Sequence, residues 1–332
     1  MKVLELFSGI GGMRFGLSEA FDGGSDLKFT SVDLDQGCNE IYHSSFGGET
    51  PMALDICSLS SEWFESLCAD IWTISPPCQP YTRQGNMLDS LDPRAAPLLH
   101  VCGVLEALLS LPNCIIVENV KNFELGDSFA KLKSVLELRG YSLFGYFCNP
   151  LDFGFPNSRL RFFLVAVLDG KRTLYTCKTL TGSEPRRPIG DFLCVAGDHS
   201  HLQIPKSTLE KQAAFCFDVV SPESLQSLCF TRAYTRFIDG TGSVLLTGTA
   251  ANTPITHDAM QRPVFKDIQS MTELDLRYFC PLEVARMQGF SISGEGLVVK
   301  GGCKAEKKYY RALGNSLNPQ IIARLVRLHL LT

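Results

Sequence analysis

A cysteine preceded by two prolines is the first feature of this 332-residue sequence that could do chemistry. Cys78 lies in SPPCQPYTRQG, directly after an apolar run that ends at Ser75. Ligands of open α/β proteins bind at the carboxyl ends of strands, and prolines restrict the loop that would carry the thiol. We therefore predict that Cys78 is a nucleophile. The alternative is a structural cysteine, which would more naturally lie within an apolar run, as Cys114 does.

Charged residues at the ends of two further apolar runs are candidates for the same site. Glu118, in ENV, can act as a general acid if its surroundings hold its proton. Arg159 and Arg161 lie two apart in an extended segment and hence on one face, where two cations can hold a phosphate or a base carbonyl. A solvated strand end is the structural alternative for all three.

The segment LFSGIGG at Leu6–Gly12 is typical of a nucleotide-cofactor site, because glycines let the backbone approach a ligand closely. Its spacing differs from GxGxxG, which disfavours a dinucleotide-binding oxidoreductase. Asp33 ends the second apolar run, where a carboxylate can accept both hydroxyls of a ribose, and Asp55 and Ile56 could flank an adenine ring. The alternatives are a tight turn, a helix cap and a turn aspartate.

These residues need a sheet to bring them together, and the first half of the chain alternates apolar and amphipathic stretches as a parallel sheet covered by helices does. Strands that are nearly all apolar, such as CIIVE and FFLVAV, suit burial on both faces. The predicted strands are Val3–Phe7, Phe29–Asp33, Met52–Asp55, Asp70–Ser75, Cys114–Glu118, Tyr141–Cys148 and Arg161–Leu168. The predicted helices are Gly12–Ala20, Gln36–Phe46, Pro97–Ser110, Phe129–Arg139, Pro281–Gly289 and Ser316–Leu331.

The alternation fades after about residue 169, where turn signals such as TGSEPRRP and DGTGS become frequent. We therefore predict a catalytic core over 1–169, a small inserted domain over 170–275, and a segment over 276–332 that returns to the core. The fold class is α/β, with a doubly wound, Rossmann-like sheet.

The composition is that of an ordinary globular protein, with 45% hydrophobic and 20% charged residues and a formal net charge of -4. The charge excludes wrapping of nucleic acid by bulk positive charge but not a local basic cleft. No run reaches the roughly 18 apolar residues of a membrane helix, and Glu5 interrupts the only stretch resembling a signal peptide. Thirteen cysteines without a CxxC pair argue against structural zinc, so we predict no metal and reduced thiols, in the cytoplasm or also the nucleus.

Taken in order, FSGIGG, Asp33, PPCQP, ENV, RLR and a terminal GNS strongly resemble the cytosine-5 methyltransferases that use S-adenosylmethionine. The resemblance covers nearly the whole chain and is weakest over about 169–225. The segments CFTRAY at Cys229–Tyr234, PPCQPYTR, IDGTGSVL and LRYFCPLEVARMQGF are similar to the branch that methylates tRNA-Asp.

The resemblance implies roles for residues in the quoted motifs. The catalytic residues would be Cys78, Glu118, Arg159 and Arg161, with the thiolate attacking the base. S-adenosylmethionine would contact Phe7, Ser8, Gly9, Ile10, Gly11, Gly12, Asp33, Asp55, Ile56, Pro76, Asn315 and Ser316. The RNA would contact Thr82, Arg83, Cys229, Thr231 and Arg232 in these motifs. The basic residues Lys304, Lys307, Lys308 and Arg311 are further candidates because of their charge, with a solvated face as the alternative. Cys229 could support catalysis or simply be buried.

The expected reaction is methylation of cytosine 38 in the anticodon loop of tRNA-Asp, by a protein expected to be monomeric and to bind DNA weakly at most. KAEKKYYR is the basic run of most interest, because tyrosines beside lysines offer stacking as well as phosphate pairing. Two rivals stay open: a DNA cytosine-5 methyltransferase, and a catalytically silent nucleic-acid-binding protein that keeps the fold.

Overall fold

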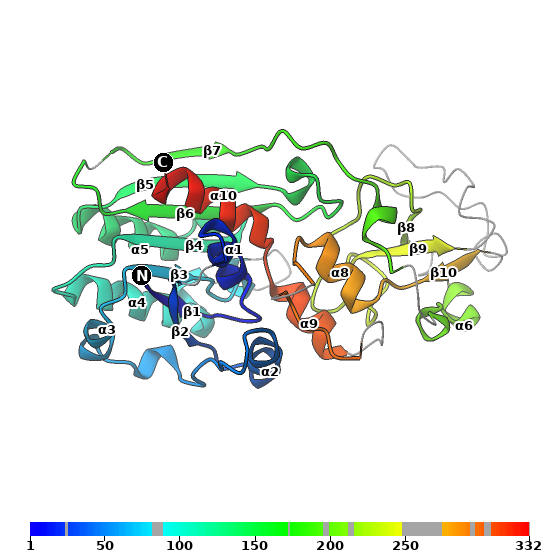
Figure 1. Ribbon diagram of the computed structural model, residues 1–332, viewed down its shortest axis with the longest axis horizontal. Helices are drawn as coiled ribbons and strands as arrows, with labels where there is room; N and C mark the ends of the chain where they lie inside the picture. Colours follow the sequence, from blue (N-terminus) through cyan, green and yellow to red (C-terminus); the bar gives the residue numbers. More distant parts are fainter. Residues whose placement is uncertain are drawn as a thin grey trace. The chain divides into compact units, whose positions relative to one another are not determined.

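The chain divides into two compact units in the computed structural model (Figure 1). The structure describes residues 1–23, 26–81, 89–171, 173–194, 199–211, 216–247, 274–292, 296–301 and 307–331. The first unit comprises Met1–Asn149, Leu160–Thr181 and Pro319–Thr332, and the second comprises Pro150–Arg159 and Gly182–Asn318. The units differ from the predicted domains, since 276–318 belongs to the second unit and only the last helix returns to the first.

A seven-stranded sheet forms the centre of the first unit, in the order β2-β1-β3-β4-β6-β5-β7. Neighbours are parallel except that β6 runs antiparallel to both β4 and β5. The sheet is therefore mixed, and the expectation of a parallel sheet was wrong at β6. The strands are β1 (Lys2–Leu6), β2 (Lys28–Val32), β3 (Ile71–Ile74), β4 (Cys114–Val120), β5 (Ser142–Cys148), β6 (Arg161–Val167) and β7 (Thr176–Thr179).

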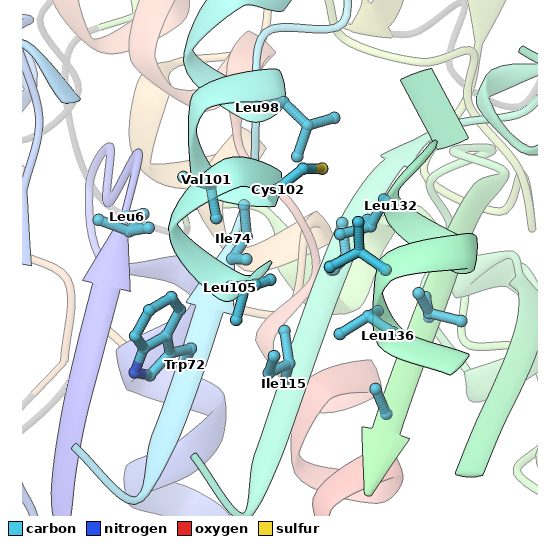
Figure 2. Close-up of a cluster of buried hydrophobic side chains, with 14 of the residues drawn as sticks. Leu6, Trp72, Ile74, Leu98, Val101, Cys102, Leu105, Ile115, Leu132 and Leu136 are labelled. Atoms are coloured by element: carbon cyan, nitrogen blue, oxygen red, sulfur yellow. The ribbon is translucent and has the colours of Figure 1, made fainter. Parts of the chain in front are cut away.

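Helices cover both faces of this sheet, as the doubly wound prediction required. Alternate strand residues pack with α4 and α5 in one apolar cluster; Figure 2 shows Trp72, Ile74 and Ile115 facing Leu105 and Leu136. On the other face α1 packs against α10, where a Cβ atom on Gly16 would lie 2.5 Å from that of Ile322. The helices are α1 (Gly12–Ala20), α2 (Gln36–Ser45), α3 (Ser61–Leu67), α4 (Ala96–Ala107), α5 (Asp127–Leu138) and α10 (Pro319–Leu330).

Most predicted elements agree with these bounds to within about three residues, and the exceptions have local causes. Met52 makes only a single bridge to Val32, and Asp55 then caps a short 3-10 turn, so Met52–Asp55 is not a strand. The helix predicted from Phe129 begins at Asp127, because the distant Asp89 carboxylate accepts hydrogen bonds from the first backbone N–H groups. The last helix begins at Pro319 rather than Ser316, since proline favours the first helical turn.

The second unit contains a small three-stranded sheet in the order β10-β9-β8, which packs its own apolar cluster. Its elements are α6 (Lys206–Leu209), β8 (Asp218–Val220), β9 (Ser243–Thr247), β10 (Asp275–Arg277), α8 (Pro281–Met287) and α9 (Lys307–Asn315). A buried ion pair between Arg277 and Glu283, with distances of 2.8 Å, links β10 to α8. In the part of the chain that the structure describes, no helix is long and apolar enough to cross a membrane.

Candidate active site

The carboxyl ends of β1, β3 and β4 lie side by side, because Leu6 pairs with Ile74 and Ile74 with Val117 in parallel register. The strand order reverses between β1 and β3, since β2 lies on one side of β1 and β3 on the other. Ligands of doubly wound folds bind at such a switch point. The loops that follow β1 and β3 carry the glycine-rich turn and Cys78, and Glu118 lies near the carboxyl end of β4 itself.

The Cys78 loop is held by Asn119, a residue for which the sequence predicted no role. Asn119, on β4, donates from its side chain to the Pro76 carbonyl oxygen at 3.2 Å. The Tyr81 N–H donates to the Cys78 carbonyl at 3.0 Å, and the Tyr81 ring packs edge-on against Phe123. The Cys78 side chain itself is half-buried. A fixed backbone with a partly accessible thiol suits a nucleophile. Asn119 is the middle residue of the ENV motif, so that motif could have indicated its role.

A cation in the same unit interacts electrostatically with the candidate nucleophile. The pKa of the Arg94 guanidinium is raised, above all by its hydrogen bond with Asp92 and to a smaller extent by the charge of Cys78. The Arg94–Asp92 contact is 2.6 Å, and the Arg94 side chain is 48% exposed. Positive charge favours the thiolate, which is the reactive form of cysteine. No motif marked Arg94 in the sequence.

Glu118 and Arg161 form an ion pair on neighbouring antiparallel strands, with 3.3 Å between Oε1 and Nε. Arg161 lies opposite Val120 in the register, so it is the diagonal neighbour of Glu118 on one face of the sheet. Both side chains are largely buried, at 12% and 17% exposure. The pairing orients the Glu118 carboxyl group.

The glycine-rich turn after β1 combines left-handed backbone with buried groups that a polar ligand could satisfy. Phe7 has φ +57°, a strained value for a non-glycine residue and one that is frequent at functional sites. Gly11 has φ +81°, and a Cβ atom there would lie 2.3 Å from the Phe46 ring. Beside Gly9 a Cβ atom would meet only open space. Ser8 Oγ is buried and lacks a hydrogen-bond partner among the described residues.

Asp33 is tied to the same turn. Its carboxylate accepts from the Gly9 N–H and the Asp35 N–H, both at 2.7 Å. Burial raises the pKa of Asp33, and these two backbone hydrogen bonds oppose the rise. Asp55 instead accepts from the Cys57 N–H as a cap, and Ile56 is buried in the core cluster at 4% exposure.

Arg159 belongs to the second unit, and its guanidinium is engaged there. It donates to the Cys229 sulfur at 3.1 Å, to the Phe230 carbonyl at 3.3 Å and to the Gly314 carbonyl at 3.1 Å. It also donates to the Ser316 carbonyl, and it is only 3% exposed. Arg159 and Arg161 therefore have different partners, and in the described residues Arg159 clamps the CFTRAY segment to the end of α9.

Several predicted RNA-contacting residues gather around this clamp. Gly314 packs so closely that a Cβ atom would lie 2.1 Å from the Arg232 nitrogen, which brings the end of α9 against the backbone of CFTRAY. The Thr231 hydroxyl accepts from the Ala233 N–H. The exposed side chains here are Arg232, Lys307, Lys308, Arg311 and Asn315. Thr82, Arg83 and Lys304 lie outside the described residues.

Cys194, Cys280 and Glu283 lie close enough together in the second unit to suggest a metal site. The carboxylate of Glu283, however, accepts both Arg277 N–H groups and the backbone N–H groups of Cys194 and Cys280. These four hydrogen bonds occupy the oxygens that a metal would need. The Glu283 contacts are those of a structural anchor.

Comparison with known proteins places these features in context. The family described as C-5 cytosine-specific DNA methylase matches residues 1–329. A Schizosaccharomyces pombe protein named tRNA (cytosine(38)-C(5))-methyltransferase is 35% identical over 99% of this chain and 96% of its own length. A Dictyostelium discoideum protein named DNA (cytosine-5)-methyltransferase is 29% identical over 98% and 93%. The solved structure of the Entamoeba histolytica methyltransferase EhMeth is similar with a TM-score of 0.82 at 29% identity, covering 98% of this chain and 97% of that one.

Proposed function

The chain belongs to the family of C-5 cytosine-specific methylases and is a cytosine-5 methyltransferase, and we propose that its substrate is cytosine 38 in the anticodon loop of tRNA-Asp. The observation that carries the proposal is the full-length similarity to the S. pombe relative, whose name specifies that position in tRNA. The Glu118–Arg161 ion pair and the Cys78 loop lie at the same end of the sheet, where β3 and β4 have their carboxyl ends, and this placement supports the chemistry.

Cys78 is the proposed nucleophile. Carbon 5 of cytosine reacts poorly because the ring is aromatic, and attack of the thiolate on carbon 6 makes carbon 5 enamine-like. The hydrogen bond from Asn119 to Pro76 fixes the loop that carries Cys78, and Arg94 is a nearby cation whose charge interacts with that of Cys78. After methyl transfer a proton is removed from carbon 5, its electron pair re-forms the double bond between carbons 5 and 6, and the Cys78 thiolate is expelled, which restores the aromatic ring.

Glu118 is the proposed partner of the base at ring nitrogen 3. A hydrogen bond or proton delivered there prevents negative charge from accumulating in the ring when Cys78 attacks. Arg161 orients the carboxyl group through the ion pair with Nε. Arg159 is proposed to act through its contacts, which set the position of Cys229 and of the GNS segment.

S-adenosylmethionine is the proposed cofactor and supplies the methyl group when bound. The turn at Phe7–Gly12 fits a ligand of this kind, since it combines open space at Gly9 with the unpartnered Ser8 hydroxyl. Asp33 would accept the ribose hydroxyls through lone pairs that its two backbone hydrogen bonds leave available. Asn315 and Ser316 stay predicted cofactor contacts.

RNA binding is assigned to the basic side chains around the Arg159 clamp, Arg232, Lys307, Lys308 and Arg311. All four are exposed, three of them on α9 and Arg232 next to Gly314 at its end, and their positive charge offsets locally the net charge of -4. The target base must leave its stack for Cys78 to reach it. An anticodon-loop base is already unpaired, so extruding it costs less than opening a duplex.

The rival proposal is methylation of duplex DNA, which the Dictyostelium relative's name favours. The test is transfer of labelled methyl groups from S-adenosylmethionine to total tRNA and, separately, to duplex DNA, with the Cys78→Ala protein as the matched control. The proposal predicts label in tRNA, little in DNA and none with Cys78→Ala. Label mainly in DNA would favour the rival, and cofactor binding without any transfer would favour a silent binding protein.

A further inference from the structure

Three buried side-chain oxygen atoms, from Glu5, Ser31 and Tyr42, lie within hydrogen-bond distance of one another and form a triangle next to the glycine-rich turn. Ser31 Oγ and the Tyr42 hydroxyl each lie 3.0 Å from Oε2 of Glu5, and they lie 2.8 Å from each other. Glu5 and Tyr42 are 1% exposed and Ser31 is 8% exposed. All three distances are those of hydrogen bonds.

The number of hydrogen atoms in the triangle depends on whether Glu5 is protonated, because an ionised carboxylate supplies none. Each hydroxyl of Ser31 and Tyr42 carries one hydrogen, and a carboxylate carries none. Two hydrogen atoms can make only two of the three hydrogen bonds. With ionised Glu5, one pair of oxygen atoms would therefore be in contact without a hydrogen atom between them. A protonated Glu5 supplies the third hydrogen, and the triangle then closes as a ring of three hydrogen bonds.

Each corner of the triangle is attached to a segment of the proposed cofactor site. Glu5 lies two residues before Phe7, and Ser31 lies two residues before Asp33. Tyr42, on α2, faces the turn itself, because a Cβ atom on Gly11 would lie 3.1 Å from its ring. A change in the triangle therefore acts on the glycine-rich turn and on Asp33 together.

We propose that Glu5 is a positioning residue of the cofactor site, and that it holds the turn and Asp33 in their binding arrangement when it carries a proton. The inference rests on the proposed use of S-adenosylmethionine. It concerns a residue behind the site that would not touch the cofactor.

The charges around Glu5 support this assignment. Burial raises the pKa of Glu5 to about 7, against the lowering effects of the hydrogen bonds from Tyr42 and Ser31 and of the Arg14 charge. The Arg14 guanidinium is paired with Glu49 at 2.7 and 2.9 Å and donates to the Tyr42 hydroxyl at 3.1 Å. The Arg14 backbone N–H donates to Oε1 of Glu5 at 3.3 Å.

The remaining neighbours do not titrate near neutral pH. Burial raises the pKa of Tyr42 far above its usual range, so that hydroxyl keeps its proton. From β3 the register partner of Glu5 is the uncharged Thr73, and from β2 it is Ser31. The Arg14 pair with Glu49 lowers the pKa of Glu49, which is therefore ionised throughout the neutral range. Among Glu5, Tyr42, Arg14 and Glu49, Glu5 is therefore the group whose charge changes near neutral pH.

The test is the affinity of the full-length protein for S-adenosylhomocysteine, measured by calorimetry between pH 6 and pH 8. Above a pKa of about 7 the protonated fraction falls tenfold per pH unit, so the wild-type protein should bind about tenfold more weakly at pH 8 than at pH 6. Glu5→Gln should abolish this difference, because the amide N–H₂ supplies the missing hydrogen at every pH. Glu137→Gln, at a glutamate of α5 whose partner is Lys133, is the matched control and should keep the wild-type slope.

The same slope in Glu5→Gln as in the wild-type protein would overturn the inference. A second measurement does not depend on the cofactor: infrared titration should show a protonated carboxyl signal that disappears near pH 7 and is missing from Glu5→Gln. Identical infrared titrations would also overturn it. If no variant bound S-adenosylhomocysteine while the infrared signals differed as expected, the proposed cofactor would be wrong and the buried proton on Glu5 would stand.

Discussion

Arg161 on β6 and Glu118 on β4 form a diagonal ion pair, with Nε and Oε1 3.3 Å apart, at the end of the sheet from which the Cys78 loop emerges. The pair arises from the antiparallel register of β4 and β6, which places Arg161 opposite Val120. It connects the proposed acid with a cation fixed by the same sheet. The orientation of Glu118 is therefore set by the fold rather than by a flexible loop.

Glu118→Gln should reduce turnover by about 100-fold or more, because an amide can donate a hydrogen bond but cannot deliver a proton. The affinity for tRNA should change little, since the side chain remains the same size. Single-turnover rates and equilibrium binding of tRNA, measured on the same preparation, separate the two effects. A variant that lost only tRNA affinity would show that Glu118 positions the RNA.

Arg159→Ala should destabilise the protein by about 3 kcal/mol or more, because it leaves several buried carbonyl oxygens without donors. Arg159→Lys should recover little of this loss, since an ammonium cannot reproduce the planar set of N–H donors. Denaturation by urea measures both changes, and Arg232→Ala, at an exposed arginine of the CFTRAY segment itself, is the control. Equal stability of Arg159→Ala and Arg232→Ala would contradict the clamp.

The parts of the fold that could be predicted follow from local pattern. Runs such as CIIVE are buried on both faces, and the helix after the glycine-rich turn begins at Gly12 as predicted. The antiparallel direction of β6 could not be predicted from a local pattern, because it depends on how residues 150–159 connect β5 to β6. The sequence of Met52–Asp55 predicted a strand, but only Met52 pairs with a neighbouring strand, through its single bridge to Val32.

The site was predictable where a motif carries its chemistry in one segment, and not where it depends on distant partners. Cys78 follows β3 and Glu118 lies near the end of the adjacent parallel strand β4, so their placement at the same end of the sheet followed from the pattern of strands. The contact between Arg159 and Cys229 joins residues 70 apart in sequence. Spacing alone placed Arg159 beside Arg161, whereas the structure gives the two side chains different partners. Glu5 looked like an interruption of an apolar strand, and only the fold brings Ser31 and Tyr42 to it.

Asp33→Ala should weaken S-adenosylmethionine by about 1.5–3 kcal/mol for each charge-assisted hydrogen bond lost. The structure adds that the Gly9 N–H would also lose its acceptor, so Asp33→Asn should be milder. Calorimetry on the purified variants measures the change. Asp35→Ala, which removes the cap of α2 and leaves the Asp33 carboxylate, controls for disturbance of the loop. Wild-type affinity in Asp33→Ala would leave Asp33 with a structural role only.

Lys307→Glu and Lys308→Glu, singly and together, should weaken tRNA binding without changing cofactor affinity. Both side chains are exposed on α9. Each lost phosphate contact should reduce the slope of log affinity against log salt concentration by about one. Filter binding over a range of salt concentrations measures this slope. Lys28→Glu, at the amino end of β2, is the charge control, and an equal effect there would show that the net charge alone decides binding.

The position of the methyl group tests the central proposal most directly. Bisulfite sequencing of tRNA-Asp after reaction with S-adenosylmethionine should show 5-methylcytosine at position 38 with the wild-type protein. It should show none with Cys78→Ala, although that variant should bind the cofactor with nearly unchanged affinity. No 5-methylcytosine in the anticodon loop, together with efficient methylation of duplex DNA by the same preparation, would contradict the account and identify DNA as the substrate.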